Sequence, residues 1–280
     1  MGPAAVYPLP TTEQAALTVL ALIVSVALPL YLLLFRPVSR RGVWGLSEIV
    51  GVTLLFIPLF LVLSVLLGLV NFRGDLTIVP FSIVTIVQNA AFVALSAYVV
   101  MVRYRLDGGR LGLRFDGLLK KVIIGVLAAA ATVPLSVGSE RFAIYLISLF
   151  VGPGAAAARA AQEHLADPLR PLLQSIPDLM SGRWILFLLT VVVPIGEEVF
   201  FRGLVYGGLR LRWGAVVGAL ASAVFFTAVH LQVVHALPIF TLGVLLAVLY
   251  GRTGSLLPGM VVHGINNVIA VLSVWRNWGF

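Results

Sequence analysis

The sequence predicts an all-α, polytopic membrane protein of about eight transmembrane helices with a polar cavity inside the bundle. Of its 280 residues, 60% are hydrophobic and 11% are charged, against roughly 25% charged residues in soluble domains. A membrane-crossing helix needs about 20 apolar residues, and runs of about this length follow one another along the chain. One of these runs contains Glu197, Glu198 and Arg202. Because charged side chains at bilayer depth usually mark a functional site, they indicate the cavity.

The composition also excludes several classes of function. The chain has no cysteine, so disulfides, thiolate metal sites and a cysteine nucleophile are unavailable. Its formal net charge of +8 comes largely from basic residues in short connectors, which is the positive-inside pattern of membrane proteins. We therefore interpret the charge as a signal of topology and expect no nucleic-acid partner. Residues 1–14 lack the basic start of a signal peptide, so none is expected to be cleaved.

The eight spans are expected in two groups of four. An N-terminal region, 1–183, precedes a catalytic core, 184–280. The predicted spans are 15–35, 49–70, 77–102, 122–138, 184–208, 214–234, 236–250 and 255–274. A shorter apolar piece, 142–151, extends the fourth span or lies at the membrane interface. The polar segment 153–183 begins with an Ala-rich helical stretch and has balanced charge, which favours an interfacial helix or cap on the extracytoplasmic side.

The charged connectors predict the orientation of the chain in a cytoplasmic membrane of the bacterial type. Even-numbered spans put both termini on one side. The basic connectors, 36–48, 103–121, 209–213 and 251–254, then all fall on the opposite side. Since basic loops remain in the cytoplasm, both termini are predicted to lie outside.

Helical geometry separates the two adjacent glutamates. Residues four apart share a helix face, so Glu198 can pair with Arg202, whereas Glu197 points about 100° away. This leaves Glu197 as an unpaired carboxylate in a low-dielectric environment, where it suits the role of general base. The alternative is that both acids only bind helices together through buried pairing.

Two further polar motifs lie in later spans. His230 follows Phe226 by four residues in the sixth span, and His263 and Asn267 share one face of the eighth. His263 and Asn267 can donate hydrogen bonds in the same direction, as stabilising an oxyanion requires. Each motif alone is equally compatible with hydrogen bonding between packed helices.

Together these groups match the requirements for hydrolysis of a carbonyl compound by an activated water. Glu197 and His230 would hold and deprotonate the water, and His263 and Asn267 would polarise the carbonyl. Alternatively, Glu197, His230 and His263 would bind a divalent metal such as zinc and leave a fourth position open. No His-Glu-x-x-His sequence is present, so activation without a metal is slightly favoured. Counting the helical rise places Glu197 and His230 at different depths, so their meeting requires a bend or a deep turn.

The order and spacing of these motifs resemble the CAAX protease and bacteriocin-processing (CPBP, or Abi) family. The matching residues are Glu197, Glu198 and Arg202, then Phe226 and His230, then His263 and Asn267, with 250–256 resembling the segment between the last two motifs. The resemblance implies that Glu197 and His230 activate water and that His263 and Asn267 form the oxyanion site. It leaves metal dependence disputed.

The expected function is therefore that of an intramembrane endopeptidase. Its substrate would be a peptide or a membrane-anchored protein, prenylated or not, reached within the lipid bilayer. A different class of function remains open, in which Glu197 and the histidines form the relay of a proton-coupled transporter or belong to a non-catalytic binding or immunity protein. Inverted repeats would favour transport, and the sequence shows none.

Overall fold

The computed structural model describes residues 24–38, 43–66, 77–165, 169–176 and 182–276, and within these ranges the regular structure is entirely helical. The N-terminal half contains η1 (Tyr31–Phe35), α2 (Leu46–Leu66), α3 (Ile78–Ala97), η3 (Tyr98–Arg103), η4 (Gly108–Leu111), α4 (Leu118–Ala129), α5 (Thr132–Val151), α6 (Pro153–Leu165) and α7 (Leu169–Gln174). The C-terminal half contains α8 (Arg183–Phe187), η5 (Leu188–Val192), α9 (Val193–Glu197), η6 (Glu198–Tyr206), α10 (Gly207–Ala228), α11 (Ala236–Thr253) and α12 (Leu257–Arg276). The predicted all-α class is confirmed, and residues 1–14 lie outside the described ranges.

Six helices among the described residues are long and apolar enough to cross a membrane, where the sequence predicted about eight. They are Leu46–Leu63, Ile78–Arg103, Leu118–Val151, Arg183–Ala228, Ala236–Thr253 and Leu257–Trp275. Part of the first predicted span lies outside the described residues, and the described part forms a shorter apolar helix, Val24–Phe35. The chain is thus an integral, multi-pass membrane protein.

The rest of the difference in span number comes from a reversal of the chain at Gly214. This glycine has φ 81° and ψ 170°, outside the helical region, and it interrupts the helical run Arg183–Ala228. After it, the Ser222 hydroxyl donates a 3.0 Å hydrogen bond to the Phe201 carbonyl, so the two arms lie side by side. The arms correspond to the predicted fifth and sixth spans.

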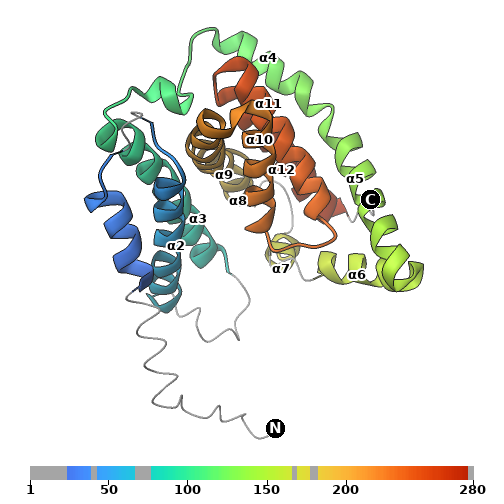
Figure 1. Ribbon diagram of the computed structural model, residues 1–280. Coiled ribbons are helices and arrows are strands. Elements are labelled where there is room, and N and C mark those ends of the chain that lie inside the picture. The colour runs from blue at the N-terminus through green and yellow to red at the C-terminus, as the bar shows by residue number, and fades with distance from the viewer. Residues whose placement is uncertain (1–23, 39–42, 67–76, 166–168, 177–181, 277–280) are drawn as a thin grey trace, which may run out of the picture.

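The helices of the N-terminal half flank the C-terminal helices on two sides. In Figure 1, α9–α12 lie between α2 and α3 on one side and α4 and α5 on the other. A methyl group on Gly125 of α4 would lie 2.8 Å from the Pro258 carbonyl oxygen of α12, so these helices touch closely. On the other side, Phe92 of α3 stacks on Phe200 of η6 with ring centroids 4.6 Å apart. The division into two functional regions stays a prediction.

The polar segment after α5 contains the predicted Ala-rich helix, which is α6. Its Glu163 accepts hydrogen bonds of 2.9 Å from the backbone N–H groups of Val233, Val234 and His235, and one of 2.7 Å from His235 Nδ1. Burial raises the pKa of Glu163, but these hydrogen bonds outweigh it and hold the pKa below its ordinary value. The helix is thereby tied to the turn between α10 and α11. Its predicted position on the extracytoplasmic side stays a prediction.

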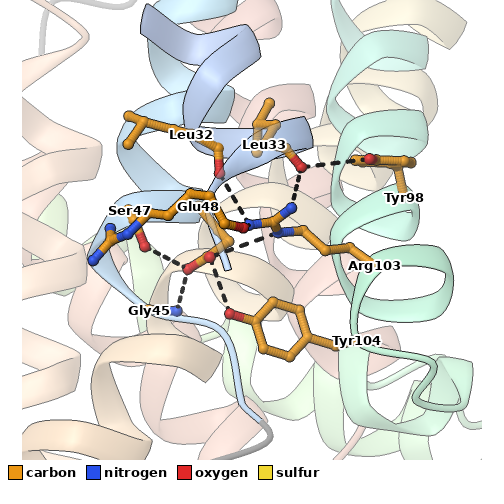
Figure 2. A network of polar contacts seen from close by, with 9 residues as sticks. Leu32, Leu33, Gly45, Ser47, Glu48, Tyr98, Arg103 and Tyr104 are labelled. Carbon is orange, nitrogen blue, oxygen red and sulfur yellow. Dashed lines mark hydrogen bonds and ion pairs between the residues drawn. The ribbon is translucent and has the colours of Figure 1, made fainter. Parts of the chain in front are cut away.

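A buried polar network joins η1, α2 and η3 (Figure 2). Glu48 is 2% exposed and accepts hydrogen bonds from the Gly45 amide and the Tyr104 hydroxyl, at 2.9 and 3.0 Å. Arg103 Nε lies 3.7 Å from Glu48 Oε1, and its guanidinium also donates to the carbonyls of Leu32 and Leu33 near the end of the first helix. These carbonyls lack partners within the helix, so the network anchors the first helix to its neighbours.

Candidate active site

The candidate site is built on a helix that changes its pitch at the glutamates. Helix α9 ends at Glu197, and η6 continues as a nine-residue π-helix from Glu198 to Tyr206 in which every residue is buried. Such wide turns occur frequently at functional sites. A tryptophan from the connector before α2 supports this segment, because Trp44 Nε1 donates a 2.7 Å hydrogen bond to the Leu204 carbonyl.

Glu198 and Arg202 pair as helical spacing predicted. Arg202 Nη1 lies 2.9 Å from Glu198 Oε1, and both side chains are 1% exposed. The Arg202 guanidinium also lies 4.3 Å from the centre of the Phe226 ring, a cation–π arrangement. Glu198 has a second partner that the sequence did not reveal, His263, whose Nδ1 lies 3.2 Å from the same carboxylate oxygen.

Glu197 has a neighbour that the sequence did not reveal. The sequence analysis expected Glu197 and His230 to hold a water between them; both line one cavity, and no ion pair within 4.0 Å joins their side chains directly. Instead, Glu197 Oε2 lies 3.7 Å from His263 Nε2, and this oxygen has no hydrogen-bond partner among the described residues. His263 therefore lies between the two glutamates. Its two ring nitrogens face different carboxylates.

His230 lies in the turn after α10, because that helix ends at Ala228 and not at residue 234 as predicted. His230 Nδ1 is 2.7 Å from the Phe226 carbonyl oxygen. A carbonyl only accepts hydrogen bonds, so Nδ1 carries the proton and Nε2 of the neutral ring keeps its lone pair. Leu231, the next residue, has φ 54°, a strained value for a non-glycine residue and one that clusters at functional sites.

Asn267 is fixed by the segment just before α9. Its Nδ2 donates a 2.8 Å hydrogen bond to the Leu189 carbonyl. The close approach depends on Gly264, where a methyl group would lie 2.5 Å from the Thr190 carbonyl oxygen. Helix α12 thus holds His263 and Asn267 against η5 and α9.

A cavity of about 310 Å³ brings these groups together. Glu197, His230, His263 and Asn267 all line it, so the four candidate catalytic residues share one space although three separate segments supply them. Helix α3 contributes Thr85, Gln88 and Asn89 to the same lining, together with apolar residues of α7, α9 and α12. The sequence analysis missed these α3 residues. The signal available was an adjacent pair of amides inside an otherwise apolar span.

The residues proposed as metal ligands do not form a metal site in this arrangement. Glu197, His230 and His263 line the same cavity. Within the described ranges, however, no group of three or more His, Asp or Glu side chains is close enough to hold a metal ion. We therefore derive no catalytic step through a metal.

Comparisons with known proteins match the part of the chain that forms this site. Residues 180–269 match the family described as "Type II CAAX prenyl endopeptidase Rce1-like". The chain is 34% identical over 112 residues to an Escherichia coli protein named "Uncharacterized 24.3 kDa protein", covering 35% of this chain and 49% of that protein. It is 29% identical over 100 residues to "Putative membrane peptidase YdiL" of Bacillus subtilis (strain 168), covering 35% of this chain and 41% of the relative.

The matched region thus spans half or less of the length of these curated relatives. No solved structure matches the chain. The family match covers α8 to most of α12, which includes every candidate catalytic residue. The resemblance expected from the three motifs is therefore confirmed. The comparisons thus show that residues 180–269 of this chain are similar to the Rce1-like type II CAAX prenyl endopeptidase family.

Proposed function

We propose that this protein is an intramembrane endopeptidase that hydrolyses a peptide bond with a water activated by Glu197 and His230. One observation carries the proposal. A carboxylate, two imidazoles and an amide line a single cavity among helices that are apolar enough to cross a membrane. Polar groups are costly at that depth and are usually functional. The family match over residues 180–269 supports the same reaction class.

In the proposed reaction, Glu197 acts as the general base. A water between Glu197 and His230 donates one proton to the Glu197 carboxylate while its oxygen attacks the carbonyl carbon of the scissile bond. The second hydrogen stays on the water oxygen and is donated in a hydrogen bond to the lone pair of His230 Nε2, which orients the nucleophile. Glu197 then returns its proton to the amide nitrogen, the C–N bond breaks, and a carboxylic acid and an amine leave.

His263 and Asn267 are proposed to stabilise the oxyanion that forms during this attack. Glu198 fixes His263 through Nδ1, which directs Nε2 toward the cavity beside Glu197. With Nδ1 donating to a carboxylate, donation from Nε2 to the oxyanion requires the doubly protonated ring. The Asn267 amide uses one hydrogen for the Leu189 carbonyl and keeps the second for the oxyanion. Glu198 and Arg202 act as positioning residues for His263.

The decisive experiment is a cleavage assay on purified protein in phosphatidylcholine vesicles, with products identified by mass spectrometry. Wild type is expected to cleave peptides or membrane-protein tails, and Glu197→Ala is expected to lose roughly 100–10,000-fold in rate, the range for a general base. Full proteolysis by the variant would contradict the mechanism. Proton-coupled solute uptake without proteolysis would favour the transporter alternative.

The same assay separates activation by glutamate from activation by a metal. We expect activity to persist after metal-free purification and treatment with a chelator. Loss of activity on chelation, restored by added zinc, would instead support binding of a metal by Glu197, His230 and His263.

A further inference from the structure

Gln88 of α3 is a glutamine in a helix apolar enough to cross a membrane, and its side-chain amide has no partner among the residues that the structure describes. It belongs to the apolar span Ile78–Arg103, is half-buried and lines the cavity that holds Glu197. Among the described residues, none makes a hydrogen bond to its side chain. Amides in membrane helices usually hydrogen-bond to a neighbouring helix. Gln88 makes no such bond, so its donors and acceptor are free to bind a ligand in the cavity.

The adjacent amide, Asn89, is used differently and fixes the position of Gln88. Asn89 is 3% exposed, and its Nδ2 donates a 2.9 Å hydrogen bond to the Thr85 carbonyl. Its side chain packs against Gly196, where any methyl group would collide with it. Gly196 directly precedes Glu197. The contact therefore holds α3, and with it Gln88, at a fixed place beside the candidate general base.

We propose that Gln88 binds the backbone of the peptide substrate beside the scissile bond. This inference rests on the proposed peptidase function. A glutamine amide presents a donor and an acceptor side by side, which complements the C=O and N–H of an extended peptide. Being uncharged, it can bind the backbone without adding a second charge to the Glu197 site.

The remaining lining of the cavity indicates the side chains that such a substrate carries. Apolar residues from α7, η5, α9 and α12 form a large part of the wall, including Leu173, Leu189, Val193, Val271 and Val274. Side chains next to the scissile bond must occupy this apolar space once water leaves it. The inferred substrate is an extended peptide with apolar residues around the cleaved bond.

The test begins with Gln88→Leu, which keeps the approximate size of the side chain and removes its hydrogen-bonding groups. Since Gln88 has no partner among the described residues, the thermal unfolding midpoint should be unchanged or slightly higher. For cleavage of quenched fluorescent apolar decapeptides in phosphatidylcholine vesicles, kcat/KM should fall roughly 10- to 100-fold, the effect of one or two hydrogen bonds. The matched control is Gln232→Leu, another half-buried glutamine that lines a different cavity, and its kcat/KM should match wild type.

A scan of the cleaved peptide with single backbone esters, each replacing one N–H by oxygen, tests the contact itself. Wild type should lose roughly tenfold in kcat/KM at one position near the scissile bond, and Gln88→Leu should be insensitive at that position alone. The inference would be overturned if ester substitution left the kcat/KM of wild type unchanged at every position. It would also be overturned if Gln88→Leu had the same kcat/KM as wild type. In either case, loss of cleavage in Glu197→Ala would leave the proposed peptidase function standing. If wild type cleaves no peptide, both proposals fall.

Discussion

Two buried clusters of this protein each place glutamate beside arginine, and they differ in whether the carboxylate oxygens are satisfied. At the start of α2, Glu48 accepts from the Gly45 amide and the Ser47 hydroxyl through Oε2, and from the Tyr104 hydroxyl through Oε1 (Figure 2). In the candidate site, Oε2 of Glu197 and Oε2 of Glu198 are buried without a hydrogen-bond partner among the described residues. Glu197 also lines a cavity.

We use this difference to propose a structural role for Glu48 and a chemical one for Glu197. A buried carboxylate costs least when hydrogen bonds and a counter-charge satisfy it completely, and the Glu48 network approaches that condition. Unsatisfied oxygens are costly to bury. The unpartnered Oε2 of Glu197, in a residue that lines the cavity, therefore fits our proposal that this carboxylate binds water. We therefore expect mutations at Glu48 to act on stability and mutations at Glu197 to act on catalysis.

The largest expected effect on folding comes from Arg202→Ala. This change strands the buried Glu198 carboxylate and also removes the guanidinium from the Phe226 ring. Breaking a buried pair in this way costs roughly 3–5 kcal/mol, so yield and the thermal unfolding midpoint in detergent should both fall. Arg252→Ala, at an exposed arginine in the last turn of α11, serves as the control. An Arg202→Ala protein as stable as this control would show that the pair is dispensable.

A smaller effect is expected from Trp44→Phe, which tests whether the N-terminal half supports the π-helix. Trp44 is 1% exposed and donates to the Leu204 carbonyl, and the glycines at 207 and 208 lie against its ring. Loss of the hydrogen bond should cost roughly 1–3 kcal/mol, read from the unfolding midpoint. Activity per folded molecule should fall less than in Glu197→Ala. An unchanged midpoint would argue against this support.

The smallest effect is expected at Glu163, and it depends on pH. Because the pKa of folded Glu163 lies below its ordinary value of 4.5, its contribution is present above pH 4.5 and is lost as pH falls through the folded pKa. Hydrogen exchange of the amides at 233–235, corrected for intrinsic rates, should therefore lose protection in acid. Glu163→Gln should show weaker protection and no such transition. Glu140→Gln, at the other carboxylate near His235, is the control, and a transition that persisted in Glu163→Gln would assign it elsewhere.

The sequence predicted well what depends on helical periodicity. Spacing of four residues placed Glu198 beside Arg202, and it put His263 and Asn267 on one face, where both line the cavity. Apolar runs also predicted the fold class, because a membrane-crossing helix has a minimum length.

The sequence did not predict features that depend on which helices are neighbours. The position of His263 between Glu197 and Glu198 results from the packing of α12 against α9 and η6. Gln88 lies in a span without a motif, so only its place in the cavity identified it. The end of α10 at Ala228 was also missed, because the apolar residues continue to Val234 while the backbone turns at Leu231.

The most direct test of this account compares Glu197→Gln with Glu48→Gln in the vesicle cleavage assay, with the thermal unfolding midpoint measured for both. Glu197→Gln should keep or raise the unfolding midpoint while activity falls roughly 100–10,000-fold. Glu48→Gln should lower the midpoint, because it leaves Arg103 without its buried counter-charge, and keep activity per folded molecule. Wild-type activity in Glu197→Gln, or an inactive Glu48→Gln with undiminished stability, would contradict the account.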